Sequence, residues 1–282
     1  MKKSVLVASA VLTACYFSSC GTKKKVESPA GGTGVQVEAA APAYKILDLP
    51  TVDLSKFPKD ADGWITLFNG KTMEGWRGYN KSVCPSAWQA VDGAITLKGS
   101  GAGEAGGADG GDLVFAHKFK NFEFEFEWKV EKGSNSGVLY MIQEVEGAPS
   151  YYSAPEYQIL DNANHPDGKL GKDGNRQSAS LYDMIPAKPQ NAKPYGEWNT
   201  GKILCYKGTV VHYQNGEPVL EYHLWTPEWK KMIDGCKFSK DKNPLAYELL
   251  INCGGPDKEG FIGFQDHGDN VWYRNIKIKS MD

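Results

Sequence analysis

The sequence predicts an all-β protein, built as an antiparallel β-sandwich with one short helix. Short runs of alternating apolar and polar residues recur from residue 64 onward, and turn pairs such as Asn-Gly and Asp-Gly separate them. The 8 Trp, 14 Tyr and 32 Gly among 282 residues are typical of aromatic strands joined by glycine turns. Strands do not alternate with helical segments, so a parallel sheet with crossover helices is excluded.

The clearest strand covers residues 121–130. Apolar side chains occupy every second position on one of its faces, while Glu123, Glu125, Glu127 and a lysine occupy the other. Such a strict period of two buries only one side of a sheet. We therefore interpret the three glutamates as a solvated face and not as catalytic groups.

Further strands complete the predicted sandwich. They are expected at residues 64–68, 88–91, 94–97, 113–115, 137–143, 157–160, 203–206, 209–214, 218–222, 247–252, 261–265 and 271–278. Tight turns join three pairs of them as hairpins, at Asp92-Gly93, Lys207-Gly208 and Asn215-Gly216.

One segment, residues 226–235, predicts the helix. Thr226 is expected as its N-cap and Pro227 as its first helical residue. Gly235 is expected to end it.

The N-terminus has the pattern of an export signal. Two lysines precede an apolar stretch at residues 5–12, which is too short to cross a bilayer. Cys15 and Cys20 both lie where bacterial lipoprotein signals place the lipidated cysteine. The residues before Cys15 fit the consensus more closely, but Cys20 leaves a more usual apolar length, and we favour Cys20. We expect an exported lipoprotein, periplasmic or held at the outer membrane or cell surface; the alternative is a secretory signal without lipid.

The remaining chain divides into a tether and one domain. After the signal at 1–20, residues 21–60 are small, Pro-containing and aperiodic, which indicates a flexible tether. Residues 61–282 show no second linker and predict a single domain. A formal net charge of −2 gives no reason to expect nucleic acid as a partner.

Four cysteines lie in this domain, and their spacing matches no zinc-binding template. They are Cys84, Cys205, Cys236 and Cys253. Export permits disulfides, so bridges and buried thiols both remain open. The sequence also has no nucleophile elbow, phosphate-binding loop or zinc-protease motif.

Two segments suggest the beginnings of a site. Glu156 and Gln158 share one face of a strand, so a carboxylate lies beside an amide, as an acid or base beside an orienting group would. Asn135 lies in a turn before a strand, where its amide would suit sugar hydroxyls or stabilise the turn.

Two later segments add aromatic and titratable groups. Trp198 is placed to stack on a sugar ring, and Asn199 to bond a hydroxyl. Gln265, Asp266 and His267 end a strand, where an imidazole can carry protons and the adjacent carboxylate can orient it. Further on, Arg274 would hold an oxyanion or balance a buried carboxylate. Asp161, Asp167 and Asp173 lie near loops and would suit calcium, although no EF-hand pattern is present.

Together these segments resemble one known family. The ordered set consists of Gly63-Trp64-Ile65-Thr66-Leu67-Phe68-Asn69-Gly70-Lys71, Gly75-Trp76, Asn135-Ser136-Gly137, Glu156-Tyr157-Gln158-Ile159-Leu160-Asp161-Asn162, Glu197-Trp198-Asn199, Asn215-Gly216, Gln265-Asp266-His267-Gly268 and Arg274-Asn275-Ile276. It is similar to the 3-keto-disaccharide hydrolase family and covers residues 61–282. The resemblance implies a concanavalin A-like lectin/glucanase fold, a jelly-roll sandwich, and cleavage of glycosides oxidised at C3 of the sugar. Residues 163–194 and 224–245 depart from the family pattern.

The resemblance also implies roles for the candidate residues. Glu156 and His267 would be base and acid, in an order that stays open, with Asp266 orienting His267. The groups Asn135, Gln158, Asn199, Gln265 and Arg274 would bind the sugar and its oxyanion, with Trp198 stacking. A divalent metal is the alternative electrophile. The competing hypotheses are a two-carboxylate glycosidase and a lectin-like module that binds carbohydrate without cleaving it.

Overall fold

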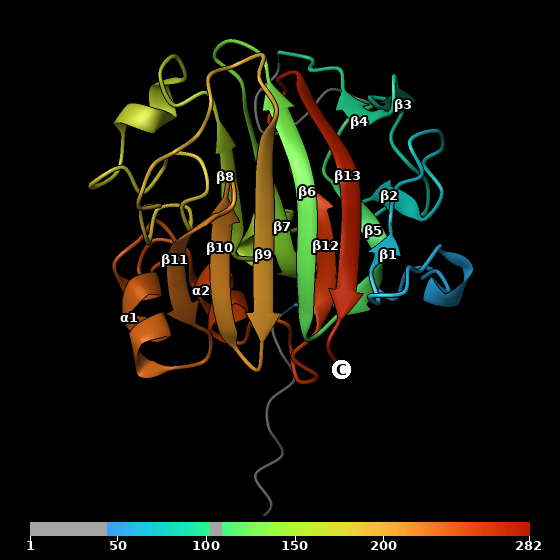
Figure 1. The fold of residues 1–282 in the computed structure, drawn as a ribbon. Coiled ribbons are helices and arrows are strands. Elements are labelled where there is room, and N and C mark those ends of the chain that lie inside the picture. Colours follow the sequence, from blue (N-terminus) through green and yellow to red (C-terminus); the bar gives the residue numbers. More distant parts are fainter. Residues whose placement is uncertain (1–43, 102–108) are drawn as a thin grey trace, which may run out of the picture. The chain divides into compact units, whose positions relative to one another are not determined.

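The computed structural model describes residues 44–101 and 109–282, which form two antiparallel sheets packed face to face (Figure 1). The predicted β-sandwich is thereby confirmed. The larger sheet has the order β11-β10-β9-β6-β13-β4-β3, with β1 paired to β13. The smaller sheet has the order β2-β5-β12-β7-β8. No helix in the described residues is long and apolar enough to span a membrane.

The strands of each sheet come from distant parts of the chain. The larger sheet contains β1 (Ile65–Thr66), β3 (Trp88–Val91), β4 (Ala94–Leu97), β6 (Phe122–Val130), β9 (Asn199–Tyr206), β10 (Thr209–Gln214), β11 (Glu217–His223) and β13 (Val271–Ser280). The smaller sheet contains β2 (Trp76–Gly78), β5 (Leu113–Phe119), β7 (Asn135–Ile142), β8 (Glu156–Leu160) and β12 (Gly260–Phe264). Short 3-10 turns lie at Leu54–Lys56, Ser150–Tyr152 and Pro166–Lys169.

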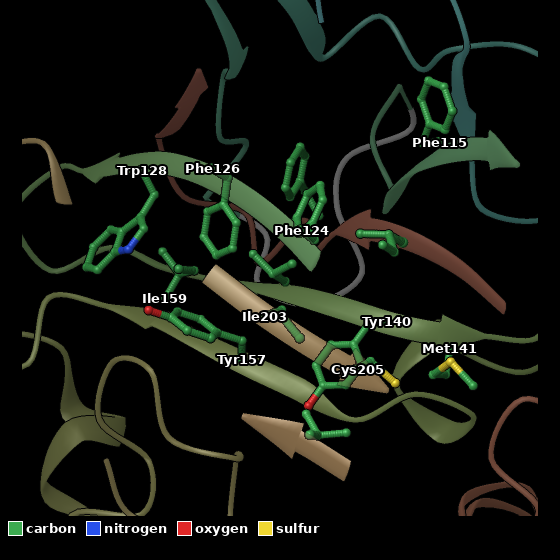
Figure 2. Close-up of a cluster of buried hydrophobic side chains, with 14 of the residues drawn as sticks. Phe115, Phe124, Phe126, Trp128, Tyr140, Met141, Tyr157, Ile159, Ile203 and Cys205 are labelled. Atoms are coloured by element: carbon green, nitrogen blue, oxygen red, sulfur yellow. The ribbon is translucent and has the colours of Figure 1, made fainter. Parts of the chain in front are cut away.

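The core lies between the two sheets and follows the predicted alternation. Phe124, Phe126 and Trp128 of β6 are buried, while the residues between them are partly exposed. They face the inner side of β8, where Tyr157 and Ile159 lie (Figure 2). The ring of Phe126 packs edge-on against Tyr157, with 5.4 Å between centroids. This contact fixes which side of β8 faces inward.

The three predicted hairpin turns are present. Their first residues, Asp92, Lys207 and Asn215, all have left-handed backbone, with φ of 50°, 49° and 50°. The glycine that follows each of them also has positive φ. This is the turn type whose twist matches that of paired strands.

The prediction of a strand at 247–252 and of a single helix is wrong. Residues Pro244–Ile251 form a second helix, α2, beside the predicted α1 (Pro227–Asp234). The side chain of Asn243 accepts a hydrogen bond from the Ala246 amide and caps α2, and Pro244 fills its first position. The apolar run that follows satisfies a buried helix as well as a buried strand, so periodicity alone misleads here.

The folded unit also begins earlier than residue 61. Phe57 packs edge-on against Phe115, with ring centroids 5.1 Å apart, and Val52 donates its amide to the Ala116 carbonyl at 2.7 Å. Residues 44–60 therefore pack on the domain instead of forming the end of a tether. The predicted signal, with Cys15 and Cys20, and tether residues 21–43 lie outside the described residues.

The four cysteines of the described ranges are all free thiols. Cys205, Cys236 and Cys253 are buried, and Cys84 is partly buried. Burial raises the pKa of Cys84 and Cys236 to about 11, and that of Cys205 to about 12. These thiols are therefore protonated at neutral pH and poorly nucleophilic.

A buried histidine in this core leads to a prediction about pH. His212 lies between the Tyr140 hydroxyl, at 2.7 Å from Nε2, and the Ala179 carbonyl, at 2.9 Å from Nδ1. Burial lowers the pKa of His212 to about 4, below the ordinary value of about 6.5 for histidine. The unfolded chain thus binds the extra proton first, and stability falls as pH drops from about 6.5 to about 4, by about 3 kcal/mol in all.

We expect His212→Gln to remove this slope from the free energy of unfolding, measured with urea between pH 4 and 7. The variant loses stability at pH 7, so the comparison concerns the slope and not the absolute value. His223→Gln, at an exposed histidine of β11, is the matched control and should keep the slope. An unchanged slope in His212→Gln would contradict the assignment.

Candidate active site

Glu156 begins β8 and lies on the outer face of the smaller sheet. Its neighbour Tyr157 points into the core (Figure 2), so alternation directs Glu156 and Gln158 to the opposite side. Only 7% of Glu156 is exposed. Its carboxyl group lies over Gly137 of β7, where an added Cβ would stand 2.5 Å from Oε1. The glycine therefore leaves the space that the carboxylate occupies.

The segment 178–182 forms a wall beside Glu156. It pairs with the outer edge of β8: the Gln158 amide donates to Ser180 O, and the Tyr182 amide donates to Glu156 O at 3.1 Å. The pKa of the Tyr182 hydroxyl is raised by burial and then by the negative charge of Glu156. This phenol thus lies within electrostatic reach of the carboxylate and stays protonated at neutral pH.

Two histidines and an aspartate lie close together near Asn135, the first residue of β7. One ligand atom each of His165, His267 and Asp269 lies within 4.8 Å of the others. His267 Nδ1 is 3.5 Å from Asp269 Oδ2, and that same oxygen accepts the Asn135 amide at 3.0 Å. The pKa of His165 is lowered by burial and by the neighbouring His267. His165 is therefore neutral at pH 7, the state in which imidazole binds metals.

The donor set of this cluster fits a divalent transition metal. Two imidazoles and one carboxylate are ligands that zinc, iron, cobalt, nickel and manganese accept. Asn135 adds an observation of its own, because its Oδ1 is buried and has no hydrogen-bond partner among the described residues. A buried acceptor without a donor is costly, and an acceptor beside this cluster suits a cation or a ligand hydroxyl.

Asp266 lies elsewhere than the predicted orienting position. Its two carboxylate oxygens accept the amides of Gly111 and Gly268, at 2.8 and 2.9 Å. The carboxylate in contact with His267 Nδ1 is instead Asp269. Asp266 and His267 follow the end of β12 in a loop, and Asp266 fastens this loop through the Gly111 and Gly268 amides.

The predicted sugar-binding amides are mostly structural in their contacts. Gln158 is fully buried and its Oε1 accepts the Ile159 amide, although Nε2 has no partner within the described chain. Asn199 is also fully buried and bonds Lys193 N and Asn215 Nδ2. The backbone of Gln265 donates to Gly137 O, which places Gln265 next to the glycine beneath Glu156.

Trp198 and Arg274 do not share this site. The Arg274 guanidinium stacks 4.0 Å from the Trp198 ring centroid, and its Nε bonds Glu127 at 2.8 Å. Glu127 lies on the outer face of the larger sheet, which is the opposite side of the sandwich from Glu156. The expectation that these two residues hold the sugar at Glu156 is therefore wrong in its geometry. Alternation shows that a residue points outward, but not from which sheet.

The three aspartates considered for calcium do not form one site. Asp161 accepts the amides of Gly133 and Asn164, and Asp167 pairs with Arg176 at 2.8 Å. Arg176 also binds Asp183 at 2.8 Å. Asp161 and Asp167 are thus engaged by protein donors, and the grouping with metal-ligand geometry in the described ranges is the histidine cluster, which does not include Asp173.

Sequence analysis missed His165, Asp269 and Tyr182. Asp269 lies two residues beyond His267, so its spacing was a signal that was available. His165 and Tyr182 lie in the variable segment 163–194, which has no strand alternation to show where they point. Only the fold brings them to Glu156 and His267.

The fold and the site define a β-sandwich enzyme in which a buried carboxylate and a cluster of metal-ligand type both lie along β7, at Gly137 and at Asn135. Residues 63–279 match the model of the family described as 3-keto-alpha-glucoside-1,2-lyase-like domain, and the chain belongs to this family. A 3-keto-disaccharide hydrolase from Bacteroides thetaiotaomicron is 58% identical over the full length of both chains. Because this relative is an enzyme and the identity extends over the full length, the chain is also an enzyme.

Solved structures agree with the fold. One from Parabacteroides distasonis, provisionally named a glycosyl hydrolase, has 31% identity and a TM-score of 0.66, and covers 79% of this chain and 95% of its own. A second with the same provisional name, also from Parabacteroides distasonis, has 26% identity and a TM-score of 0.59, over 77% of this chain and 99% of its own.

The contact between Gly137 and Glu156 gives a prediction. Gly137→Ala would place a methyl group against Glu156 Oε1, so we expect the carboxylate to move and the protein to lose about 1–3 kcal/mol. Urea unfolding and a crystal structure of the variant test both effects. Gly235→Ala is the matched control, because its Cβ would meet atoms no closer than 3.5 Å. A Gly137→Ala protein as stable as this control, with Glu156 unmoved, would contradict the close packing.

Proposed function

We propose that the chain is a glycoside hydrolase whose substrates carry a ketone at C3 of the sugar. It cleaves the glycosidic bond by elimination across C1 and C2, followed by addition of water. The observation that carries this proposal is that a buried carboxylate and a metal-ligand cluster lie along the same strand: Glu156 over Gly137 of β7, and Asp269 of the cluster on the Asn135 amide. The relative named 3-keto-disaccharide hydrolase supports the substrate class.

The chemistry follows from the position of the ketone. A carbonyl at C3 acidifies the proton on C2, which is next to the anomeric carbon. Removal of that proton and departure of the oxygen at C1 leave a C1–C2 double bond. Water then adds across it, with hydroxyl at C1 and a proton at C2. The net reaction is hydrolysis, and it needs one group that takes and returns a proton and one that stabilises the enolate oxygen.

Glu156 is proposed as the proton-transferring group. Its carboxylate takes the C2 proton. The carboxyl group then donates this proton to the oxygen that departs from C1. In the second half, the carboxylate activates water and a proton returns to C2. One carboxylate can serve both halves, which agrees with the single strong carboxylate candidate on a strand of this site. Shielding from water strengthens each of these electrostatic interactions.

His165, His267 and Asp269 are proposed to hold a divalent metal. When bound, the metal supplies Lewis-acid stabilisation of the charge at the ketone and enolate oxygens. In this proposal His267 is a ligand, so both the base and the acid role are assigned to Glu156. Arg274 cannot stabilise the enolate oxygen at the Glu156 site, because Arg274 pairs with Glu127 on the outer face of the other sheet.

The role of Glu156 can be tested directly. We expect Glu156→Gln to reduce turnover of a 3-keto-glucoside by about 1,000-fold or more, because general acid–base transfer contributes factors of this order. The melting temperature should change little, since Gln is close in shape. Glu125→Gln, which alters a carboxylate of the other sheet paired with Lys277, is the matched control and should keep full turnover.

Assaying each protein on a 3-keto-glucoside and on the same glucoside without the ketone separates the mechanisms. Cleavage of the keto form alone supports elimination. Full activity of Glu156→Gln removes Glu156 from the mechanism, and cleavage of both substrates favours direct displacement at C1.

Metal binding gives an independent test. We expect about one equivalent of a transition metal after dialysis against Mn²⁺, Co²⁺ or Zn²⁺, measured by elemental analysis, and a higher melting temperature with metal than with EDTA. His165→Ala and Asp269→Asn should lose both effects, while His223→Ala should keep them. Binding should weaken below about pH 6, where imidazoles take up protons. A wild-type protein that binds no metal would contradict the site.

A further inference from the structure

A second hollow lies on the outer face of the larger sheet, away from Glu156. It has a volume of about 690 Å³ and crosses β10, β9, β6, β13 and β1, because each of these strands contributes to its lining. We call it the groove. Figure 1 shows these strands side by side. The volume lies within the range of about 300–1,000 Å³ that is usual for small-molecule sites.

The groove exists because β13 is irregular at this point. Arg274 pairs with Glu127 and Lys277 with Glu125, so β13 carries two residues where β6 carries one. The first of them, Asn275, has left-handed backbone with φ of 50°. Such bulges re-aim side chains and are characteristic of functional edges of sheets. The result is a local opening in an otherwise continuous ladder.

The lining of the groove is polar except for one aromatic ring. The ring of Tyr213 stands at one side. Phe126 and Ile276 also belong to the lining, but both are almost fully buried and their side chains pack in the core between the sheets. Gly201 of β9 contributes to the lining without a side chain. An aromatic face beside several polar groups is a surface on which a sugar ring can pack.

The charges on the rim cancel. Glu125 binds Lys277 at 3.0 Å, and Lys202 lies 4.3 Å from the Tyr213 ring centroid. Glu127 accepts a hydrogen bond from Asn275 Nδ2 at 2.6 Å. The lining therefore contains two glutamates and two lysines, with no excess of either sign. A charged ligand gains nothing from such a balanced rim, whereas a neutral ligand with many hydroxyl groups finds both donors and acceptors.

We propose that the groove binds a neutral oligosaccharide and is a second carbohydrate site, separate from the Glu156 site. The apolar C–H faces of a sugar would pack against the Tyr213 ring, and its hydroxyls would bond Asn275 and the paired charges. The two sites lie on opposite outer faces of the sandwich. The groove would therefore hold a glycan without occupying the site of cleavage, and it does not depend on the proposed reaction.

Calorimetric titration of the full chain with maltohexaose, cellohexaose and xylohexaose, each separately, tests the proposal. We expect at least one of them to bind and Tyr213→Ala to weaken that binding by about tenfold or more, which corresponds to about 1.4 kcal/mol. Thr200→Trp, which fills the groove from an exposed position on β9, should weaken the same binding. Turnover of a small 3-keto-glucoside should be unchanged in both variants.

Tyr206→Ala is the matched control. Tyr206 is an exposed tyrosine of β9 that also carries a lysine on its ring, Lys207 at 5.2 Å, but it does not line the groove. Its variant should bind as the wild type does. The proposal is overturned if none of the three sugars binds, if Tyr213→Ala and Thr200→Trp bind like Tyr206→Ala, or if hexagalacturonate binds more tightly than all three neutral sugars. Loss of turnover in Glu156→Gln leaves these results unaffected, so the two proposals fail separately.

Discussion

The face-to-face packing of two sheets is the constraint on which the rest of this structure depends. Once Phe126 of β6 packs against Tyr157 of β8, alternation assigns every residue of both strands to the core or to one outer face. Glu156 must then point outward from the smaller sheet, and Glu125 and Glu127 outward from the larger one. A slip of one residue in β8 would bury Glu156 in the core and expose Tyr157. The core thus positions the carboxylate as strictly as any contact within the site does.

Two carboxylates on the outer face of the smaller sheet, Glu144 and Glu156, are nearly buried, and their surroundings differ. Glu144, just after β7, is neutralised by Arg77 of β2 through two bonds of 2.5 and 2.7 Å. Such a matched pair is held by geometry and has no group left for chemistry. Glu156 is shielded differently, by the absence of a side chain at Gly137 and by the segment that carries Tyr182. The two carboxylates of this face are therefore buried by different local surroundings.

The strands could be predicted because each carries its own signal. Residues of β6 alternate strictly, and turns such as Asn215-Gly216 mark where neighbouring strands begin. Helix α2 was missed because a short apolar run fits either element, and only the cap at Asn243 distinguished them. Strand β2 (Trp76–Gly78) is too short for any period to appear. The site was harder still, because the pairing of distant strands, and not local pattern, sets Glu156 and Trp198 on opposite outer faces of the sandwich.

Most residues of the candidate site lie in loops and not in strands. Glu156 and Gly137 come from regular strands, but His165 and Tyr182 come from the segment 163–194, one of the two segments expected from the sequence to depart from the family pattern. This segment is nevertheless tied down: Arg176 joins Asp167 to Asp183, and residues 178–182 extend the sheet beyond β8. In the proposed mechanism a regular strand supplies Glu156, while a segment fastened by ion pairs and backbone bonds stands beside it. Differences in substrate preference within the family should therefore arise in this segment, where sequence can change without disturbing the sheet that holds Glu156.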